Sequence, residues 1–158
     1  MKRIIGKAAG LCLFLSAPAL AADQLVGTWQ MIYQQIGSAH MAPLPIALKV
    51  TQSGSSLQFD YLMNRELELT RSFTVRTDGS PAPIKNSSGA VVGIAKLTKS
   101  SATEYKLVMQ SPNKPAEPGK LTLSEGGKIL RCDSEAILPD RGTSHIVQVF
   151  AKQGAEPQ

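Results

Sequence analysis

The stretch LVGTWQMIYQQ at residues 25–35 places apolar side chains on alternate positions. Trp29, Met31 and Tyr33 share one parity, and the polar Gln30 lies between the first two. Because neighbouring side chains in a β-strand point to opposite faces, this alternation predicts a strand with one buried face. Trp29 is the only tryptophan of the chain, so the largest apolar side chain stands near the start of this first strand.

The same alternation recurs along the chain between clusters of glycine, proline, asparagine and serine. The candidate strands cover residues 25–35, 45–52, 55–62, 65–77, 90–99, 103–110, 119–124, 128–136 and 144–152. The longest intervening segments, DGSPAPIKNSSG at 78–89 and SPNKPAEPG at 111–119, are rich in turn-forming residues and are predicted to be loops.

The predicted fold class is all-β, an antiparallel up-and-down closed barrel of about eight strands. Closure is expected because no helical segment is present to cover a flat sheet, and closure removes exposed sheet edges. Beyond the first strand, the parity predicted to face the interior holds Phe59, Tyr61, Leu67, Leu69, Phe73, Val75, Tyr105 and Met109. An eight-stranded barrel is just wide enough to be filled by side chains or to hold one small ligand.

The tripeptide Gly27-Thr28-Trp29 resembles the G-x-W signature of the first strand in lipocalin-like (calycin) barrels. A P-x-x-L-x-V-x-x-x-G-x-x-L hairpin over residues 45–57, KLTLSEGGKIL at 120–130 and VFAKQ at 149–153 extend the likeness. The chain is therefore similar to small exported lipocalin-like proteins of bacteria. The resemblance implies that Gly27 permits a close approach of the chain and that Trp29 plugs the barrel floor.

The chain departs from lipocalins proper in two places. The T-D-Y type motif between their sixth and seventh strands is replaced by the proline-rich segment 111–119. Lipocalins also pack an arginine of the final strand over the tryptophan, and neither Lys152 nor Arg141 matches that position well. The barrel is therefore expected, but membership of the lipocalin family is not. A biotin site like that of the avidins is disfavoured because such sites resemble a box of several tryptophans.

Residues 1–21 have the order of a secretory signal peptide. Lys2 and Arg3 precede an apolar run of about a dozen residues, too short for a spanning helix, and Ala19-Leu20-Ala21 follows. Cleavage after Ala21 would leave residues 22–158 as a lipocalin-like β-barrel domain, periplasmic or secreted, without an integral membrane span.

Electrostatics and cysteine content narrow the possible partners. The formal net charge is +5, and three of the positively charged residues lie in the predicted leader. The rest of the chain contains no run of basic residues with interleaved aromatics. A nucleic-acid partner is therefore not expected. Cys132 is the only thiol outside residues 1–21, which rules out an intrachain disulfide in the mature chain and favours a buried strand residue.

No motif indicates catalysis, a metal or a cofactor. His40, His145 and Cys132 lack metal-ligand spacing, and Cys132 and Asp133 point to opposite faces of one strand. Glu66 and Glu68 share a strand face and could form an acid/base pair, but that face is predicted to be in water. The protein is predicted not to be an enzyme.

Arg71 is a charged residue that shares the inward parity of Leu67, Leu69, Phe73 and Val75. Two interpretations remain open. A β-bulge or bend could turn the side chain outward, or Arg71 could stand inside at a cavity that takes a carboxylate or phosphate head group.

The predicted function is binding of a small apolar or amphipathic molecule in the barrel lumen. The residues expected to line the site are Met31, Tyr33, Phe59, Tyr61, Arg71, Phe73, Tyr105 and Met109. The alternative is a side-chain-filled barrel that acts as an envelope interaction module through loops around residues 78–89 and 111–119. A lumen void of about 300 Å³ or more would favour the first hypothesis, and a filled lumen the second.

Overall fold

The computed structural model describes residues 21–63, 66–139 and 142–154. Its strands are β1 (Gly27–Ile36), β2 (Ala39–Met41), β3 (Ile46–Ser53), β4 (Ser56–Met63), β5 (Glu68–Arg76), β6 (Ala82–Asn86), β7 (Val91–Lys99), β8 (Glu104–Gln110), β9 (Glu117–Ser124), β10 (Ile129–Leu138) and β11 (Gly142–Lys152). The single-turn 3₁₀ helix η1 (Glu125–Gly127) joins β9 to β10. No helix in the described ranges is long and apolar enough to cross a membrane. The predicted leader and its cleavage site at residues 1–21 lie outside these ranges, apart from Ala21.

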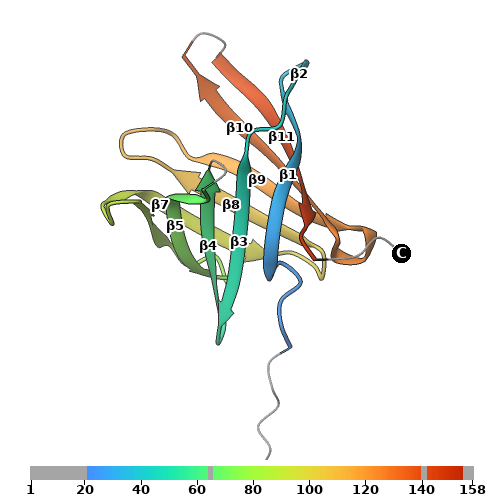
Figure 1. The fold of residues 1–158 in the computed structure, drawn as a ribbon. Coiled ribbons are helices and arrows are strands. Elements are labelled where there is room, and N and C mark those ends of the chain that lie inside the picture. The colour runs from blue at the N-terminus through green and yellow to red at the C-terminus, as the bar shows by residue number, and fades with distance from the viewer. Residues whose placement is uncertain (1–20, 64–65, 140–141, 155–158) are drawn as a thin grey trace, which may run out of the picture.

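The strands form one antiparallel sheet that closes on itself (Figure 1). From β3 to β11 each strand pairs with the next along the chain, and β1 pairs with both β3 and β11. The three-residue β2 pairs only with the upper part of β1, so ten strands form the barrel and one is extra. The predicted all-β closed barrel is confirmed, with slightly more strands than the expected eight.

The additional barrel strand, β6, arises in a segment that was predicted to be a loop. The segment APIKN at Ala82–Asn86 contains a proline and stands between turn-forming residues, features that usually argue against a strand. Its pairing with β5 is limited to Arg71 with Asn86 and Ser72 with Lys85. Ile84 points inward and is buried, so β6 is held by packing and by β7 more than by its ladder to β5.

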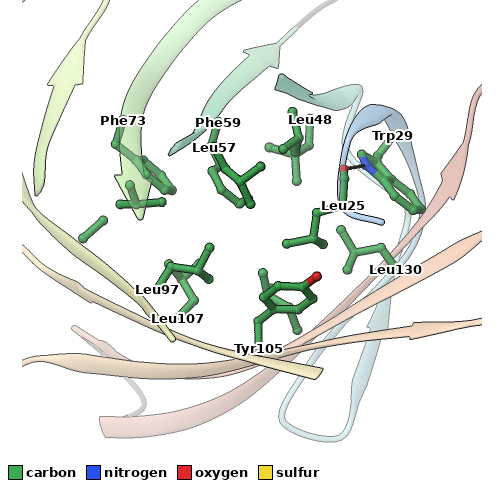
Figure 2. Close-up of a cluster of buried hydrophobic side chains, with 14 of the residues drawn as sticks. Leu25, Trp29, Leu48, Leu57, Phe59, Phe73, Leu97, Tyr105, Leu107 and Leu130 are labelled. Carbon is green, nitrogen blue, oxygen red and sulfur yellow. Dashed lines mark hydrogen bonds between the residues drawn. The ribbon is translucent and has the colours of Figure 1, made fainter. Parts of the chain in front are cut away.

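Large apolar side chains from nearly every strand meet in the barrel interior (Figure 2). The Phe59 and Phe73 rings stack at a centroid distance of 5.0 Å, and Leu48, Leu97 and Tyr105 are almost fully buried around them. Most of these residues hold the parity that the alternation assigned to the interior. Burial of apolar surface at roughly 25 cal/mol per Å² therefore stabilises a core that occupies much of the barrel.

A β-bulge at Ile32 reverses the faces of the upper half of β1. Met31 lies opposite Phe150 and Tyr33 lies opposite Val149, so Ile32 is an extra residue in the ladder. Beyond the bulge Gln34 is buried and Tyr33 is on the outer side. The prediction that Tyr33 faces the lumen is therefore wrong, because the extra residue shifts the period-2 pattern by one position.

A second bulge reverses the faces at the start of β5. Tyr61 pairs with Arg71 and Leu62 pairs with Leu69, which leaves Thr70 as the extra residue. The Thr70 hydroxyl donates to the carbonyl of Tyr61 at 3.0 Å. Leu69 is consequently 38% exposed instead of buried.

Leu67, which was also predicted to face the interior, precedes β5 in a turn. It has a positive φ of 54° and is 52% exposed. The interior parity of residues 65–77 therefore applies only from Arg71 onward.

The segment before β1 covers one end of the barrel. The Trp29 indole is fully buried and its Nε1–H donates to the carbonyl of Leu25 at 2.9 Å (Figure 2). The Asp23 carboxylate accepts from the Tyr105 hydroxyl at 2.6 Å and pairs with Lys99 at 2.7 Å. These contacts tie residues ahead of the first strand to β7 and β8, and so close this end.

Candidate functional site

Among the described residues a cavity of about 60 Å³ lies in the lumen, between β4–β5 and the opposite wall of β8–β11. Its polar lining residues are Tyr61, Arg71, Glu117, Cys132, Asp133, Ser134 and Gln148. Its apolar lining residues include Leu107, Met109, Leu121 and Phe150. The cavity is thus an amphipathic space, with charge on both sides and aliphatic and aromatic surface between.

The size of this cavity shows that the interior is largely filled. A volume of 60 Å³ corresponds to about two water molecules at roughly 30 Å³ each, well below the roughly 300 Å³ of a usual ligand pocket. The hollow lumen that would favour ligand binding is therefore not preformed in this state.

The predicted lining residues fall into three groups. Tyr61, Arg71 and Met109 meet at the cavity. Met31, Phe59, Phe73 and Tyr105 are buried in the packed core. Figure 2 shows the last three of them. Tyr33 lies outside the lumen, where its hydroxyl contacts Gln35 and His40, each at 2.7 Å.

Arg71 faces the lumen, although a bulge does occur beside it. The guanidinium carbon lies 4.2 Å from the centroid of the Tyr61 ring, the geometry of a cation–π contact. Burial raises the pKa of Tyr61 to about 12, with Arg71 acting in the opposite direction. Among the described residues no carboxylate forms an ion pair with Arg71. Of the two interpretations of Arg71, the structure therefore supports the inward one.

Glu117 supplies a second charge to the cavity from the far wall. It lies opposite Met109 in the β8–β9 ladder, and paired residues of antiparallel strands share a face. Glu117 was not predicted as a site residue, because it lies within the segment 111–119 that was predicted to be a loop. Ser134 and Gln148 were not predicted either, because they are polar residues and the inward face was assigned from apolar ones.

Cys132 lines the cavity as a protonated thiol. Burial, and then the charge of Asp133, raise the pKa of Cys132 to about 12. Asp133 lies on the outer face, where it binds Arg131 at 2.7 Å and approaches His145 at 3.3 Å. The hydrogen bond from Arg131 contributes most to lowering the pKa of Asp133. Cys132 and Asp133 therefore cannot act as one nucleophilic centre, as their opposite faces predicted.

The weakest seam of the barrel lies next to Arg71. The β4–β5 ladder runs from Ser56 to Met63, whereas β5 and β6 share two residue pairs. On the outer side of this seam a hollow of about 220 Å³ reaches Phe73. The interior is consequently separated from solvent here by side chains and not by a continuous ladder.

A hollow of about 430 Å³ forms a furrow on the outer face of β8–β11. Its charged lining residues are Glu104, Lys106, Lys120, Asp133, Glu135 and His145. Lys120 is paired with Glu104 at 2.6 Å, and Asp133 with Arg131, so the charges largely compensate one another. In the part of the chain that the structure describes, no group of three or more histidine, cysteine or acidic residues is placed to hold a metal ion.

No protein-family model and no curated protein matches the sequence. Among solved structures, the fold is similar to zebrafish ileal bile acid-binding protein in complex with cholic acid. The TM-score is 0.57 at 13% sequence identity, covering 82% of this chain and 98% of the other. The shared feature is the fold, a closed antiparallel β-barrel.

Proposed function

We propose that this protein is a non-enzymatic carrier that binds a small amphipathic anion, with the anionic group at Arg71 and the apolar part in the barrel interior. The observation that carries the proposal is the guanidinium of Arg71, which forms no ion pair with the described residues and lies over the Tyr61 ring at the edge of the cavity. A cation inside a barrel is destabilising unless it is paired or reaches water. A carboxylate or phosphate would provide that pairing through two parallel hydrogen bonds.

The surroundings of Arg71 favour an anion that contacts it directly. Tyr61 fixes the plane of the guanidinium by stacking, which reduces the freedom lost when a ligand binds. Glu117 places a negative charge on the opposite wall of the same cavity. An anion displaced from Arg71 toward that wall would be repelled, so the head group has one favourable position.

A ligand with an apolar body requires the interior to open, because the cavity holds only about 60 Å³. Met109 lines the cavity with a flexible thioether side chain that can repack. The two-pair seam between β5 and β6 lies beside Arg71 and breaks fewer hydrogen bonds on opening than any longer ladder. Binding is therefore expected to be coupled to a rearrangement of the lumen side chains.

Two further observations support the proposal. The structural neighbour was solved with cholic acid, which is itself an amphipathic carboxylate. The signal-like sequence of residues 1–21 favours action in the periplasm or outside the cell.

A second function, an envelope interaction module, is favoured by the filled interior alone. The 60 Å³ cavity is as expected for a barrel whose role is structural. In that case the exposed connections, such as residues 111–116, would contact a partner and Arg71 would serve stability.

The experiment that separates the two functions is calorimetric titration with laurate and with dodecanol, which share an apolar chain but differ in charge. We expect the wild type to bind laurate and the Arg71→Met variant to bind it roughly tenfold or more weakly, since hydrogen bonds to charged groups contribute about 1.5–3 kcal/mol. Dodecanol affinity should be equal in both. Lys96→Met, on the outer face of β7, is the matched control and should leave both affinities unchanged. Absence of binding of both laurate and the hydroxylated carboxylate cholate to the wild type would favour the interaction module.

A further inference from the structure

Gln34 is a buried polar residue whose hydrogen bonding is incomplete. Its side chain is only 6% exposed, and among the described residues its side-chain oxygen has no hydrogen-bond partner. Buried acceptors are nearly always paired with a donor, because an unpaired one loses its bonds to water without replacement. The oxygen of Gln34 is therefore free to accept a hydrogen bond from a group that the described residues do not supply.

The fold directs Gln34 toward the same interior as Arg71. Gln34 lies opposite Gln148 in the β1–β11 ladder, and Gln148 lines the cavity together with Arg71. Paired residues of antiparallel strands share a face, so Gln34 lies on the lumen side. The bulge at Ile32 produces this placement: without the extra residue Gln34 would point to water and Tyr33 would point inward.

We propose that Gln34 is a second recognition residue of the lumen, whose side-chain oxygen accepts a hydrogen bond from a hydroxyl or amide N–H of the ligand. The ligand class is then an amphipathic anion that also carries a hydrogen-bond donor on its apolar body, such as a hydroxylated carboxylate, in preference to a plain fatty acid. This inference rests on the proposed function and specifies the ligand class of that same site.

The discrimination follows from the incomplete bonding of Gln34. A ligand with a donor satisfies the buried oxygen, whereas an analogue without the donor leaves it unpaired and displaces any water from it. Arg71 does not distinguish such analogues, because both carry the same anionic group. The two residues therefore contribute separable preferences, Arg71 for charge and Gln34 for a donor.

The test compares cholate with 5β-cholanate, which has the same skeleton and carboxylate but no hydroxyl groups. Dissociation constants for both are measured by calorimetry on the wild type, Gln34→Met, Arg71→Met and the control Gln110→Met, which alters an exposed glutamine of β8. We expect the preference for cholate over cholanate to fall by about tenfold in Gln34→Met. Arg71→Met should weaken both ligands by the same factor, and Gln110→Met should change neither.

The outcomes separate the two proposals. An unchanged cholate preference in Gln34→Met, together with weakening of both ligands in Arg71→Met, would overturn the role of Gln34 and leave the proposed function standing. Absence of binding of both ligands to the wild type would overturn both. Gln34→Met should melt at or above the wild-type temperature without ligand, because it removes an unpaired buried acceptor. Gln34→Leu provides a second apolar variant if Gln34→Met does not fold.

Discussion

The ammonium nitrogen of Lys152 lies 5.1 Å from the centroid of the Trp29 ring. The same nitrogen donates to the carbonyl of Gln24 at 3.3 Å. The last strand of the barrel is thereby joined to the first strand and to the segment that precedes it. In sequence Lys152 is a poor match to the arginine that lipocalins pack over their tryptophan, yet the structure places its cation over Trp29.

Replacing Lys152 by methionine removes this cation and its hydrogen bond but keeps most of the apolar stem. We expect the free energy of unfolding to fall by about 0.5–1 kcal/mol, the usual contribution of a partly exposed cation–π contact. Denaturant unfolding followed by Trp29 fluorescence measures the change. The control Lys96→Met removes an exposed cation of β7, and an equal loss in both variants would show that the Trp29 contact contributes nothing.

Gly27 occupies backbone space that other residues rarely adopt, with a φ of 149°. A Cβ atom at this position would also lie 2.5 Å from Cε of Lys152. We expect Gly27→Ala to destabilise the protein by about 1–3 kcal/mol, mainly through backbone strain, because the lysine chain can move aside. In the double variant Gly27→Ala/Lys152→Ala, which has no Cε at position 152, most of that loss relative to Lys152→Ala should remain. Recovery of the loss in the double variant would instead identify the side-chain overlap as the cause.

Asp23 should stabilise the folded protein at neutral pH and lose this contribution in acid. Burial tends to raise the pKa of its carboxyl, but hydrogen bonds from Lys99, Tyr105 and the backbone N–H of Leu25 together lower it below its usual value. A carboxyl with a lowered pKa stabilises the folded state above the unfolded pKa of about 4, and this contribution is lost as the pH falls through the folded value.

The measurement is the free energy of unfolding between neutral pH and about pH 2. Asp23→Asn should be less stable than the wild type at neutral pH, and the difference should shrink below about pH 4. Glu135→Gln, which alters an exposed carboxyl of β10, is the matched control. A difference that is constant over the whole pH range would contradict the role of the charged carboxylate.

The thiol of Cys132 should be unreactive in the folded protein. Burial raises its pKa to about 12, and the thiolate is the reactive form. With Cys12 replaced by serine, Cys132 is the only thiol, and a disulfide reagent should label it at least about a hundredfold more slowly at neutral pH than after unfolding. Rapid labelling would show that the lumen wall at Cys132 opens to solvent. A bound amphipathic anion should slow the labelling further.

The class of fold was predictable because it depends on local alternation. Residues such as Phe59 and Tyr105 lie in strands whose two-residue alternation is not interrupted by a bulge. Their burial follows from that alternation alone. β6 escaped prediction because its five residues contain Pro83 and are stabilised by neighbours distant in sequence. The inward orientation of the Arg71 side chain was predicted only as one of two alternatives. The alternation of a strand determines which face a side chain occupies only when no bulge interrupts it.

The sequence by itself determined that this chain forms a closed antiparallel barrel, because side-chain alternation and turn residues act over a few positions. Tertiary structure alone decided which polar groups enter the interior. Because of the bulge at Ile32, Gln34 faces the lumen in place of Tyr33. One extra residue in a strand cannot be recognised from the sequence when all its neighbours also favour a strand. It also decided the volume of the lumen, since the space left beside Arg71 depends on how side chains from distant strands pack together.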